Sequence, residues 1–275
     1  MQKLKLSNVN VEVAARLILK NINLEINKGE TVLILGPNGH GKSTLLKTIM
    51  HHYDTKIVDG QIFIDETDAT NFETDQIARA GVYLANQYPV EIPGVSMLEL
   101  IRTEVQKSDE KVSVMKLYQL LNKRMAELNM SNELLNRSIN ENFSGGERKK
   151  SEILQMQVLN PDFILLDEID SGLDVDAVSV ISEALNKEKQ NGKAIIYVSH
   201  NDKLLANLVP DKVVLIVNGE IVKIGDNSLA IEINDLGYAE YAKKHNINIV
   251  KEDSKEFEDT DYLKDTISGY TCSGK

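Results

Sequence analysis

Nine consecutive residues near the start of the chain have the types and the spacing to bind a polyphosphate. They fit the pattern G-x-x-x-x-G-K-[ST], with Gly36, Gly41, Lys42 and Ser43 at the four fixed positions. Glycines allow successive backbone N–H groups to turn toward phosphate oxygens, and a helix N-terminus adds partial positive charge. The residues that we expect to contact the nucleotide here are Gly36, Pro37, Asn38, Gly39, His40, Gly41, Lys42, Ser43 and Thr44.

Two side chains of this loop carry its chemistry. Lys42 is expected to reach the β- and γ-phosphates, and the Ser43 hydroxyl to ligate Mg²⁺. His40 occupies a variable position, and we expect its side chain to face solvent rather than a phosphate. The alternative is a glycine-rich turn with a surface lysine. The apolar run 31–35 predicts a strand and the run 42–50 a helix, and this strand–loop–helix order favours a nucleotide site.

A second candidate site element is the pair of acids that ends the apolar run 163–166. A carboxylate at the carboxyl end of a parallel strand points into the crevice where phosphates bind. Asp167 is therefore expected to hold Mg²⁺ directly or through water, and Glu168 to accept a proton from, or polarise, an attacking water. A pair of solvated acids is the alternative. Their position in an apolar strand downstream of the phosphate loop favours the metal and catalytic roles.

The elements that must position these residues follow from the hydrophobic pattern. Alternating apolar and polar residues over 2–35 predict an antiparallel β layer, and helical spacing over 95–142, with no strand signal, predicts a helical subdomain. We expect an α/β core formed by 1–94 and 143–245, into which that subdomain is inserted. The remainder, 246–275, is expected to be an acidic, solvated C-terminal tail.

Composition and charge exclude several classes of function. The chain has 275 residues, 42% of them hydrophobic, and a net charge of −11, which disfavours nucleic acid and anionic membranes as partners. No apolar run approaches the ~18 residues of a membrane span, and no secretory signal is evident, so we expect a cytoplasmic protein without direct membrane insertion. The single cysteine, Cys272, cannot form an intrachain disulfide or by itself hold a four-cysteine cluster.

Further motifs follow the phosphate loop in the order found in ABC ATPases. The run 144–147 resembles the ABC signature motif, and 171–174 resembles the D-loop. Gln87 stands where the Q-loop glutamine of that family contacts Mg²⁺ and the attacking water. His200 resembles the switch histidine that contacts the γ-phosphate, although a lone histidine after a strand is often structural. The residues that this resemblance adds to the nucleotide site are Ser144, Gly145, Gly146 and Asp174.

The resemblance, which covers about 2–245, implies the fold and the reaction. The fold would be that of an ABC ATPase nucleotide-binding domain, an α/β P-loop core with an antiparallel β layer and a helical subdomain. The cofactors would be ATP and Mg²⁺. The signature motif would cap the γ-phosphate of ATP on a second protomer, so a transient ATP-dependent homodimer is implied. The implied catalytic residues are Glu168, His200 and Gln87, and the implied metal ligands are Ser43, Gln87 and Asp167.

Within the ABC ATPases, four segments resemble the SufC family of the Suf iron–sulfur cluster assembly system. They are 87–96, 143–156, 170–174 and 225–238. The resemblance implies an ATP-binding and ATP-hydrolysing subunit that acts in the cytoplasm with SufB- and SufD-like scaffold proteins. ATP-dependent dimerisation would drive a conformational change in that scaffold, and the partners would carry the cluster ligands.

Two other interpretations share the same catalytic motifs. One is the ATP-binding subunit of a membrane ABC transporter, which would dock on a permease. The other is a non-transport ABC switch protein in repair or translation, a class that usually brings tandem cassettes or long coiled-coil arms. This chain has one phosphate loop and one signature motif. The segments 88–96 and 225–238 are the docking-side features that distinguish the first two classes.

Two features depart from the common ABC pattern or stay outside it. ABC ATPases usually place an aromatic upstream of the phosphate loop to stack on adenine, whereas 8–16 offers only aliphatics such as Val11 and Val13. Recognition of the base should therefore be weak or supplied from elsewhere. The adjacent His51 and His52 have no matching cluster of ligands, and we expect them at the surface.

Overall fold

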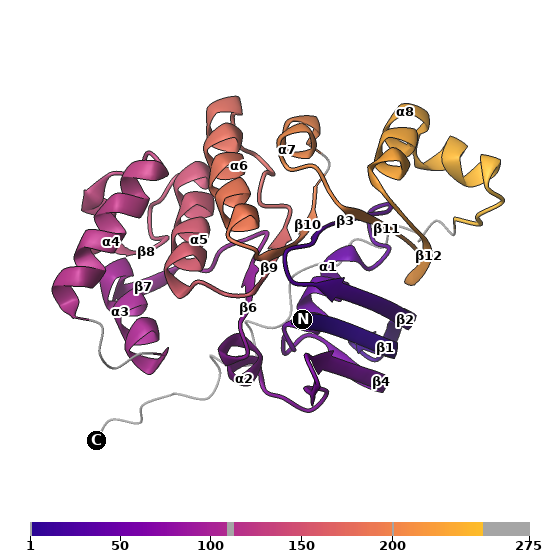
Figure 1. Ribbon diagram of the computed structural model, residues 1–275, viewed down its shortest axis with the longest axis horizontal. Helices are drawn as coiled ribbons and strands as arrows, with labels where there is room; N and C mark the ends of the chain where they lie inside the picture. Colours follow the sequence, from indigo (N-terminus) through magenta and orange to yellow (C-terminus); the bar gives the residue numbers. More distant parts are fainter. Residues whose placement is uncertain (1, 109–112, 200, 250–275) are drawn as a thin grey trace, which may run out of the picture.

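A computed structural model describes residues 2–108, 113–199 and 201–249 of the chain (Figure 1). The expected switch histidine, His200, lies outside the described residues, as does the predicted tail from residue 250 onward. The described part of that tail is packed rather than fully solvated, because Ile247 and Ile249 lie partly buried against the core.

The antiparallel layer expected over 2–35 forms, but 31–35 lies in the central sheet instead, and strands from 56–68 complete the layer. A four-stranded sheet has the order β2-β1-β4-β5. Alternate residues of β1 and β2 are buried, which is the pattern of a sheet with one face on the core. Two of its strands, β4 and β5, come after the phosphate loop in the sequence. The bounds are β1 Lys3–Val13, β2 Arg16–Asn27, β4 Lys56–Ile64 and β5 Thr67–Asp68.

A six-stranded sheet forms the centre of the molecule. Its order is β12-β11-β3-β10-β9-β6, and all neighbours are parallel except the hairpin of β11 and β12. Every residue of β3, β9 and β10 is buried, as expected for parallel strands covered on both faces. The bounds are β3 Thr31–Leu35, β6 Val82–Ala85, β9 Phe163–Asp167, β10 Ala194–Val198, β11 Lys212–Val217 and β12 Glu220–Gly225.

Successive residues of these strands enter two different cores. Val32 and Ile34 of β3 join the cluster shared with the antiparallel sheet and helix α1 (Lys42–Ile49), whereas Leu33 and Leu35 join the cluster on the other face. Helices α5 (Gly145–Leu159), α6 (Val175–Gln190), α7 (Asp202–Asn207) and α8 (Asn227–Lys244) cover that second face (Figure 1). The period-2 alternation therefore builds a layered fold, with α1 between the two sheets.

The segment expected to be helical lies at one end of the molecule in Figure 1. It contains α3 (Met97–Ser108), α4 (Val114–Glu127) and the 3₁₀ helix η1 (Asn132–Asn136). The expectation that it lacks strands is wrong, because β8 (Ser138–Ile139) pairs antiparallel with β7 (Ile92–Ser96). A two-residue strand has no periodicity of its own, and only the tertiary pairing creates it.

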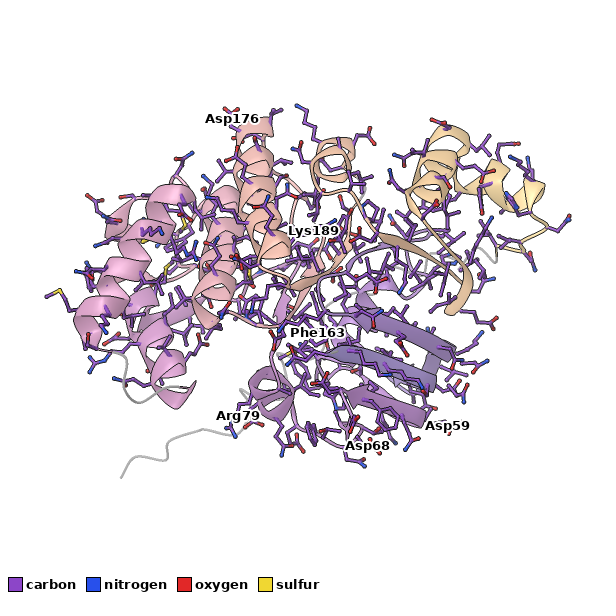
Figure 2. The ribbon with its side chains drawn as sticks, viewed as in Figure 1. Asp59, Asp68, Arg79, Phe163, Asp176 and Lys189 are labelled. Atoms are coloured by element: carbon purple, nitrogen blue, oxygen red, sulfur yellow. The ribbon has the colours of Figure 1, made fainter. Side chains whose placement is uncertain are left out.

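Helix α2 (Thr74–Arg79) has Glu73 as its N-cap, in a capping box with Gln76. Charged side chains gather at the periphery, as Figure 2 shows for Arg79 and Asp176, while Phe163 lies in the interior. No helix in the described ranges combines the length and the apolar character needed to cross a bilayer.

Candidate active site

The loop between β3 and α1 needs glycine at both of its ends. Gly36 has a φ of 151°, and a Cβ there would lie 2.1 Å from the carbonyl oxygen of Ile216. Gly41, the N-cap of α1, has a φ of 99°, and its Cβ would lie 2.7 Å from Leu19 Cδ2. The left-handed conformation at Gly41 and the close packing at both positions leave no room for a side chain. Both ends of the loop therefore pack directly against β11 and β2.

Lys42 is buried inside this loop. Its Nζ donates hydrogen bonds to the carbonyl oxygens of Gly36 at 2.7 Å and of Pro37 at 3.0 Å. Burial lowers the pKa of Lys42, while the nearby charges of Glu168 and Asp167 oppose that shift. The ammonium is thus placed at the phosphate loop with acceptors that a phosphate could replace.

Ser43 and Asp167 bring two oxygen ligands together from elements far apart in the sequence. The Ser43 hydroxyl donates to Asp167 Oδ1 at 2.9 Å. Burial raises the pKa of Asp167, as does the charge of Glu168, while the bond from Ser43 lowers it. Hydroxyl and carboxylate oxygens are the donors that Mg²⁺ prefers, so this pair fits the metal that an ATP site requires. A cation placed here would also offset the cost of burying the Asp167 carboxylate.

Glu168 lies next to it in an unusual backbone conformation. Its φ is 46°, in the left-handed region, and its N–H donates to the carbonyl of Val198 at 3.2 Å. The amide Nε2 of Gln87 donates to Glu168 Oε2 at 2.7 Å. Gln87 and Glu168 are therefore in direct contact. They follow the ends of β6 and β9, which are neighbouring parallel strands.

Two residues of α5 hold the start of the Q-loop and were not singled out from the sequence. Lys149 Nζ donates to the carbonyls of Asn86, at 3.3 Å, and of Gln87. The N–H of Asn86 donates to Glu152 Oε2 at 3.4 Å, and burial raises the pKa of Glu152 to about 7. The sequence signal that could have identified them is a lysine and a glutamate three residues apart on a helix face expected to be buried. Buried charges require partners, so such a pair indicates contacts with another element.

The signature residues form the exposed start of α5. Ser144 is its N-cap in a capping box with Glu147, with N···O distances of 2.8 and 3.2 Å. A Cβ added at Gly145 would meet nothing within 4 Å, and none of the hydrogen bonds that Ser144 makes within the described residues reaches the phosphate loop. Asp174 caps α6 in the same way, accepting from the N–H of Ala177 at 2.7 Å. These helix starts are open to a ligand or a second molecule.

Both expectations of exposed histidines need correction. His40 is only 8% exposed. Its Nδ1 accepts a hydrogen bond from the N–H of Asn218 at 2.8 Å, in the turn between β11 and β12. His51 is half-buried, with its Nδ1 2.8 Å from the carbonyl oxygen of Phe72. Tertiary contacts with distant turns cover both rings.

A hollow of about 190 Å³ opens beside the phosphate loop. It has an aliphatic wall from β2 and a polar wall from the phosphate loop and the β11–β12 turn. Its lining residues are Leu17, Ile18, Lys20, Gly39, His40, Asn218 and Gly219. The hollow is large enough for part of a nucleoside and adjoins the place where a phosphate chain would begin.

The structure therefore sorts the expected residues into two groups. The phosphate loop, Gln87, Asp167 and Glu168 converge through hydrogen bonds between Ser43 and Asp167 and between Gln87 and Glu168. Ser144, Gly145, Gly146 and Asp174 lie instead at the starts of α5 and α6.

The chain is similar to known proteins over most of its length. The family model described as "ABC transporter" matches residues 19–171. A probable ABC transporter ATP-binding protein of Streptococcus pyogenes serotype M3 is 41% identical over 255 residues, which are 92% of this chain and 100% of that protein. A probable ATP-dependent transporter of Synechocystis is 40% identical over 240 residues, 86% of this chain and 94% of its own.

A solved structure shares the fold. It is the dimeric, post-hydrolysis state of an ATP-binding cassette bound to ADP and Pi. Its TM-score is 0.70 at 24% identity, over 82% of this chain and 98% of the other. At that identity the likeness concerns the fold alone.

Proposed function

The chain belongs to the ABC transporter family of ATP-binding proteins, and we propose that it is the ATPase subunit of a Suf-type iron–sulfur cluster assembly machinery. In this proposal ATP-dependent dimerisation drives a conformational change in SufB- and SufD-like scaffold proteins. The observation that carries the Suf assignment is the resemblance of 87–96 and 225–238 to the SufC family, and the exposed apolar segment that directly follows Gln87 offers a docking surface. Tyr88 is 80% exposed, Val90 69% and Ile92 37%.

ATP would bind with its phosphates along the loop 36–44 and against the Lys42 ammonium. Ser43, Asp167 and Gln87 would hold the Mg²⁺ that accompanies the nucleotide. When bound, that ion neutralises phosphate charge. Glu168 would accept the proton of the attacking water, and its hydrogen bond from Gln87 holds the carboxylate in place. His200 would contact the γ-phosphate.

The base would lie in the hollow beside the phosphate loop. Leu17 and Ile18 supply an aliphatic wall there, and Lys20 a polar edge. The segment 8–16 has no aromatic residue to stack on the base, and this wall would contact the base instead. Dispersion and shape would hold the base instead of aromatic stacking.

A second copy of the chain would complete each site. Ser144, Gly145 and Gly146 present an open helix N-terminus, which suits the γ-phosphate of ATP bound to a facing protomer. Asp174 would lie at the same interface. The solved cassette described above is dimeric, which supports this arrangement.

The segment after Gln87 is built to transmit the nucleotide state to a partner. Two contacts hold it: Asn140 Nδ2 donates to the backbone carbonyl of Val90 at 2.8 Å, and the Glu91 side chain pairs with Arg148 of α5 at 2.5 Å. Movement of Gln87 or of α5 on ATP binding would therefore displace the exposed apolar side chains. Exposed apolar surface of this kind marks protein interaction sites.

The second candidate function is the ATP-binding subunit of a membrane ABC transporter. The names of the relatives favour it, since these are a probable ABC transporter ATP-binding protein and a probable ATP-dependent transporter. The same segment would then dock on a permease. Every nucleotide-site assignment is shared between the two candidates, so only the identity of the partner separates them.

The test is purification of the native chain from cells without detergent, followed by identification of the bound chains. We expect a complex with SufB- and SufD-like proteins that raises ATPase activity several-fold. The double variant Tyr88→Ser with Val90→Ser should lose these partners and keep ATP binding. Tyr53→Ser is the matched control, because Tyr53 is 89% exposed on another surface. Recovery in the membrane pellet with a polytopic permease would contradict the Suf assignment.

A further inference from the structure

The last helix of the described chain, α8, contacts the phosphate loop. Its residue Tyr238 forms a hydrogen bond with Gly36, the first residue of the loop. Helix α8 is interrupted at Gly237, where φ is 73° and ψ is 158°. This backbone region is essentially restricted to glycine. A Cβ on Gly237 would meet nothing within 4 Å, so the conformation, and not the packing, requires glycine. The break turns the chain so that the second part of the helix begins with Tyr238.

The Tyr238 hydroxyl accepts a hydrogen bond from the N–H of Gly36 at 3.1 Å. The parallel pairing of β3 with β11 ends with Leu35 opposite Leu215, and Gly36 is the next residue and is buried. A buried amide beyond the end of a strand ladder needs another acceptor. Tyr238 provides it, and burial raises the pKa of its hydroxyl further while the hydrogen bond from Gly36 opposes that shift.

Gly36 is therefore confined by two elements. The Ile216 carbonyl lies so close that no Cβ would fit, and the Tyr238 hydroxyl fixes the direction of the amide. The loop has a second attachment farther along. His40 accepts from the N–H of Asn218, whose side-chain amide donates to the carbonyl of Asn248 at 2.7 Å. Asn248 lies in the segment that follows α8, so the C-terminal part of the fold holds the phosphate loop at two places.

We propose that Tyr238 is a positioning residue for nucleotide binding, acting through the Gly36 amide. The proposal rests on the nucleotide-binding role of the loop 36–44. Without the hydroxyl, the Gly36 N–H is a buried donor that has lost this acceptor. A shift of the loop that pairs this donor elsewhere would also displace the residues expected to contact the phosphates. The loss of a buried hydrogen bond corresponds to about tenfold weaker ATP binding.

The test compares two tyrosine variants of the same helix. Tyr238→Phe removes the hydroxyl that contacts Gly36. Tyr241→Phe is the matched control, because Tyr241 is buried in α8 and its hydroxyl makes no hydrogen bond within the described residues. ATP affinity is measured by calorimetry with Mg²⁺, and steady-state ATPase kinetics by phosphate release. We expect Tyr238→Phe to raise the KM for ATP about tenfold with little change in kcat, and Tyr241→Phe to resemble the unmodified protein.

A direct readout of the bond distinguishes positioning from a general loss of stability. In protein labelled with ¹⁵N-glycine, Tyr238→Phe should shift the Gly36 amide proton upfield and speed its exchange with solvent. Tyr241→Phe should leave that signal in place. Gly237→Ala adds a second route, because strain at this φ should displace Tyr238 and move the same signal in the same direction.

Each result decides the matter. An unchanged Gly36 signal and unchanged ATP affinity in folded Tyr238→Phe would overturn the proposal, and so would an equal loss of affinity in Tyr241→Phe. If Tyr238→Phe does not fold, Gly237→Ala takes its place, and weakened binding without a shifted Gly36 signal would overturn the proposal. Failure of the unmodified protein to bind ATP would instead contradict the nucleotide role of the loop.

Discussion

At the scale of single residues, Lys42 shows how burial prepares a group for its ligand. Its ammonium is removed from water and held by two carbonyl oxygens, with no ion pair among the described residues. Carbonyl dipoles compensate a buried cation only partly, as the lowered pKa of Lys42 indicates. A polyphosphate would supply the missing negative charge. The charged form of Lys42 is thus partly compensated in the free protein, and a bound nucleotide would stabilise it further.

We expect Lys42→Ala to weaken Mg²⁺–ATP binding by at least tenfold. A charge-assisted hydrogen bond contributes roughly 1.5–3 kcal/mol, and the glycine amides offset the phosphate charge only in part. Titration calorimetry measures the effect. Lys116→Ala on the exposed face of α4 is the control for the loss of one positive charge. Undiminished affinity in a folded Lys42→Ala protein would remove the basis for the nucleotide site.

The chemistry of the site was readable from the sequence where the pattern is local. The spacing of Gly36, Gly41 and Lys42 is fixed within one loop, and its strand–helix context lies beside it. The environment of His40 could not be read in this way, since its partner Asn218 is 178 residues away. The left-handed conformation of Glu168 has no sequence signal either.

At the scale of elements, α5 links the candidate signature motif to the Q-loop through two buried charges. Lys149 and Glu152 hold Asn86 and Gln87 from the same helix that begins with Ser144. Desolvation favours the neutral form of Glu152, and the charge of Lys149 only partly opposes it. The folded state therefore retains a proton on Glu152 at pH values where the unfolded chain has released it.

This difference predicts how stability depends on pH. The pKa of Glu152 is about 7 in the folded protein and near 4.5 when it is unfolded, so the free energy of unfolding falls as pH rises through this window. The fall is about 3 kcal/mol and is complete above pH 7. Glu152→Gln keeps an acceptor for the Asn86 amide and should remove most of that fall.

Urea unfolding between pH 5 and 8 measures the effect. The variant should be more stable than the unmodified protein at pH 8, and the two should differ little at pH 5. Glu183→Gln on the exposed side of α6 is the control for a lost negative charge, and it should leave the pH dependence unchanged. Equal pH slopes in Glu152→Gln and in the unmodified protein would show that Glu152 titrates normally.

Elements were predictable in proportion to their length and burial. The apolar runs of β3, β9 and β10 identified the central strands, because a parallel strand covered on both faces has no polar side. The short β8 was missed, since its pairing with β7 is a tertiary event. The glycine at 237 was visible in the sequence, but its role in turning α8 toward the phosphate loop was not.

At the scale of the whole molecule, the described residues form two separate halves of the proposed catalytic arrangement. One half, around Lys42, Asp167 and Glu168, lies at the ends of the central strands. The other half, around Ser144 and Gly145, is the exposed start of α5. Within the described residues, Ser144 makes no hydrogen bond to the phosphate loop 36–44. The order of motifs predicted the fold from sequence, but only the structure shows that the second half is open to another molecule. A single copy would therefore bind ATP and hydrolyse it slowly, and two copies would close on two nucleotides.

The most direct test of this account is sedimentation of Glu168→Gln with saturating ATP and Mg²⁺. The substitution keeps the shape of the side chain and the contact with Gln87 but removes the proton acceptor. We predict that the variant binds ATP, hydrolyses almost none of it and sediments as a dimer, and that it sediments as a monomer without nucleotide. A strictly monomeric variant under saturating ATP, also in the presence of its partner proteins, would contradict the account.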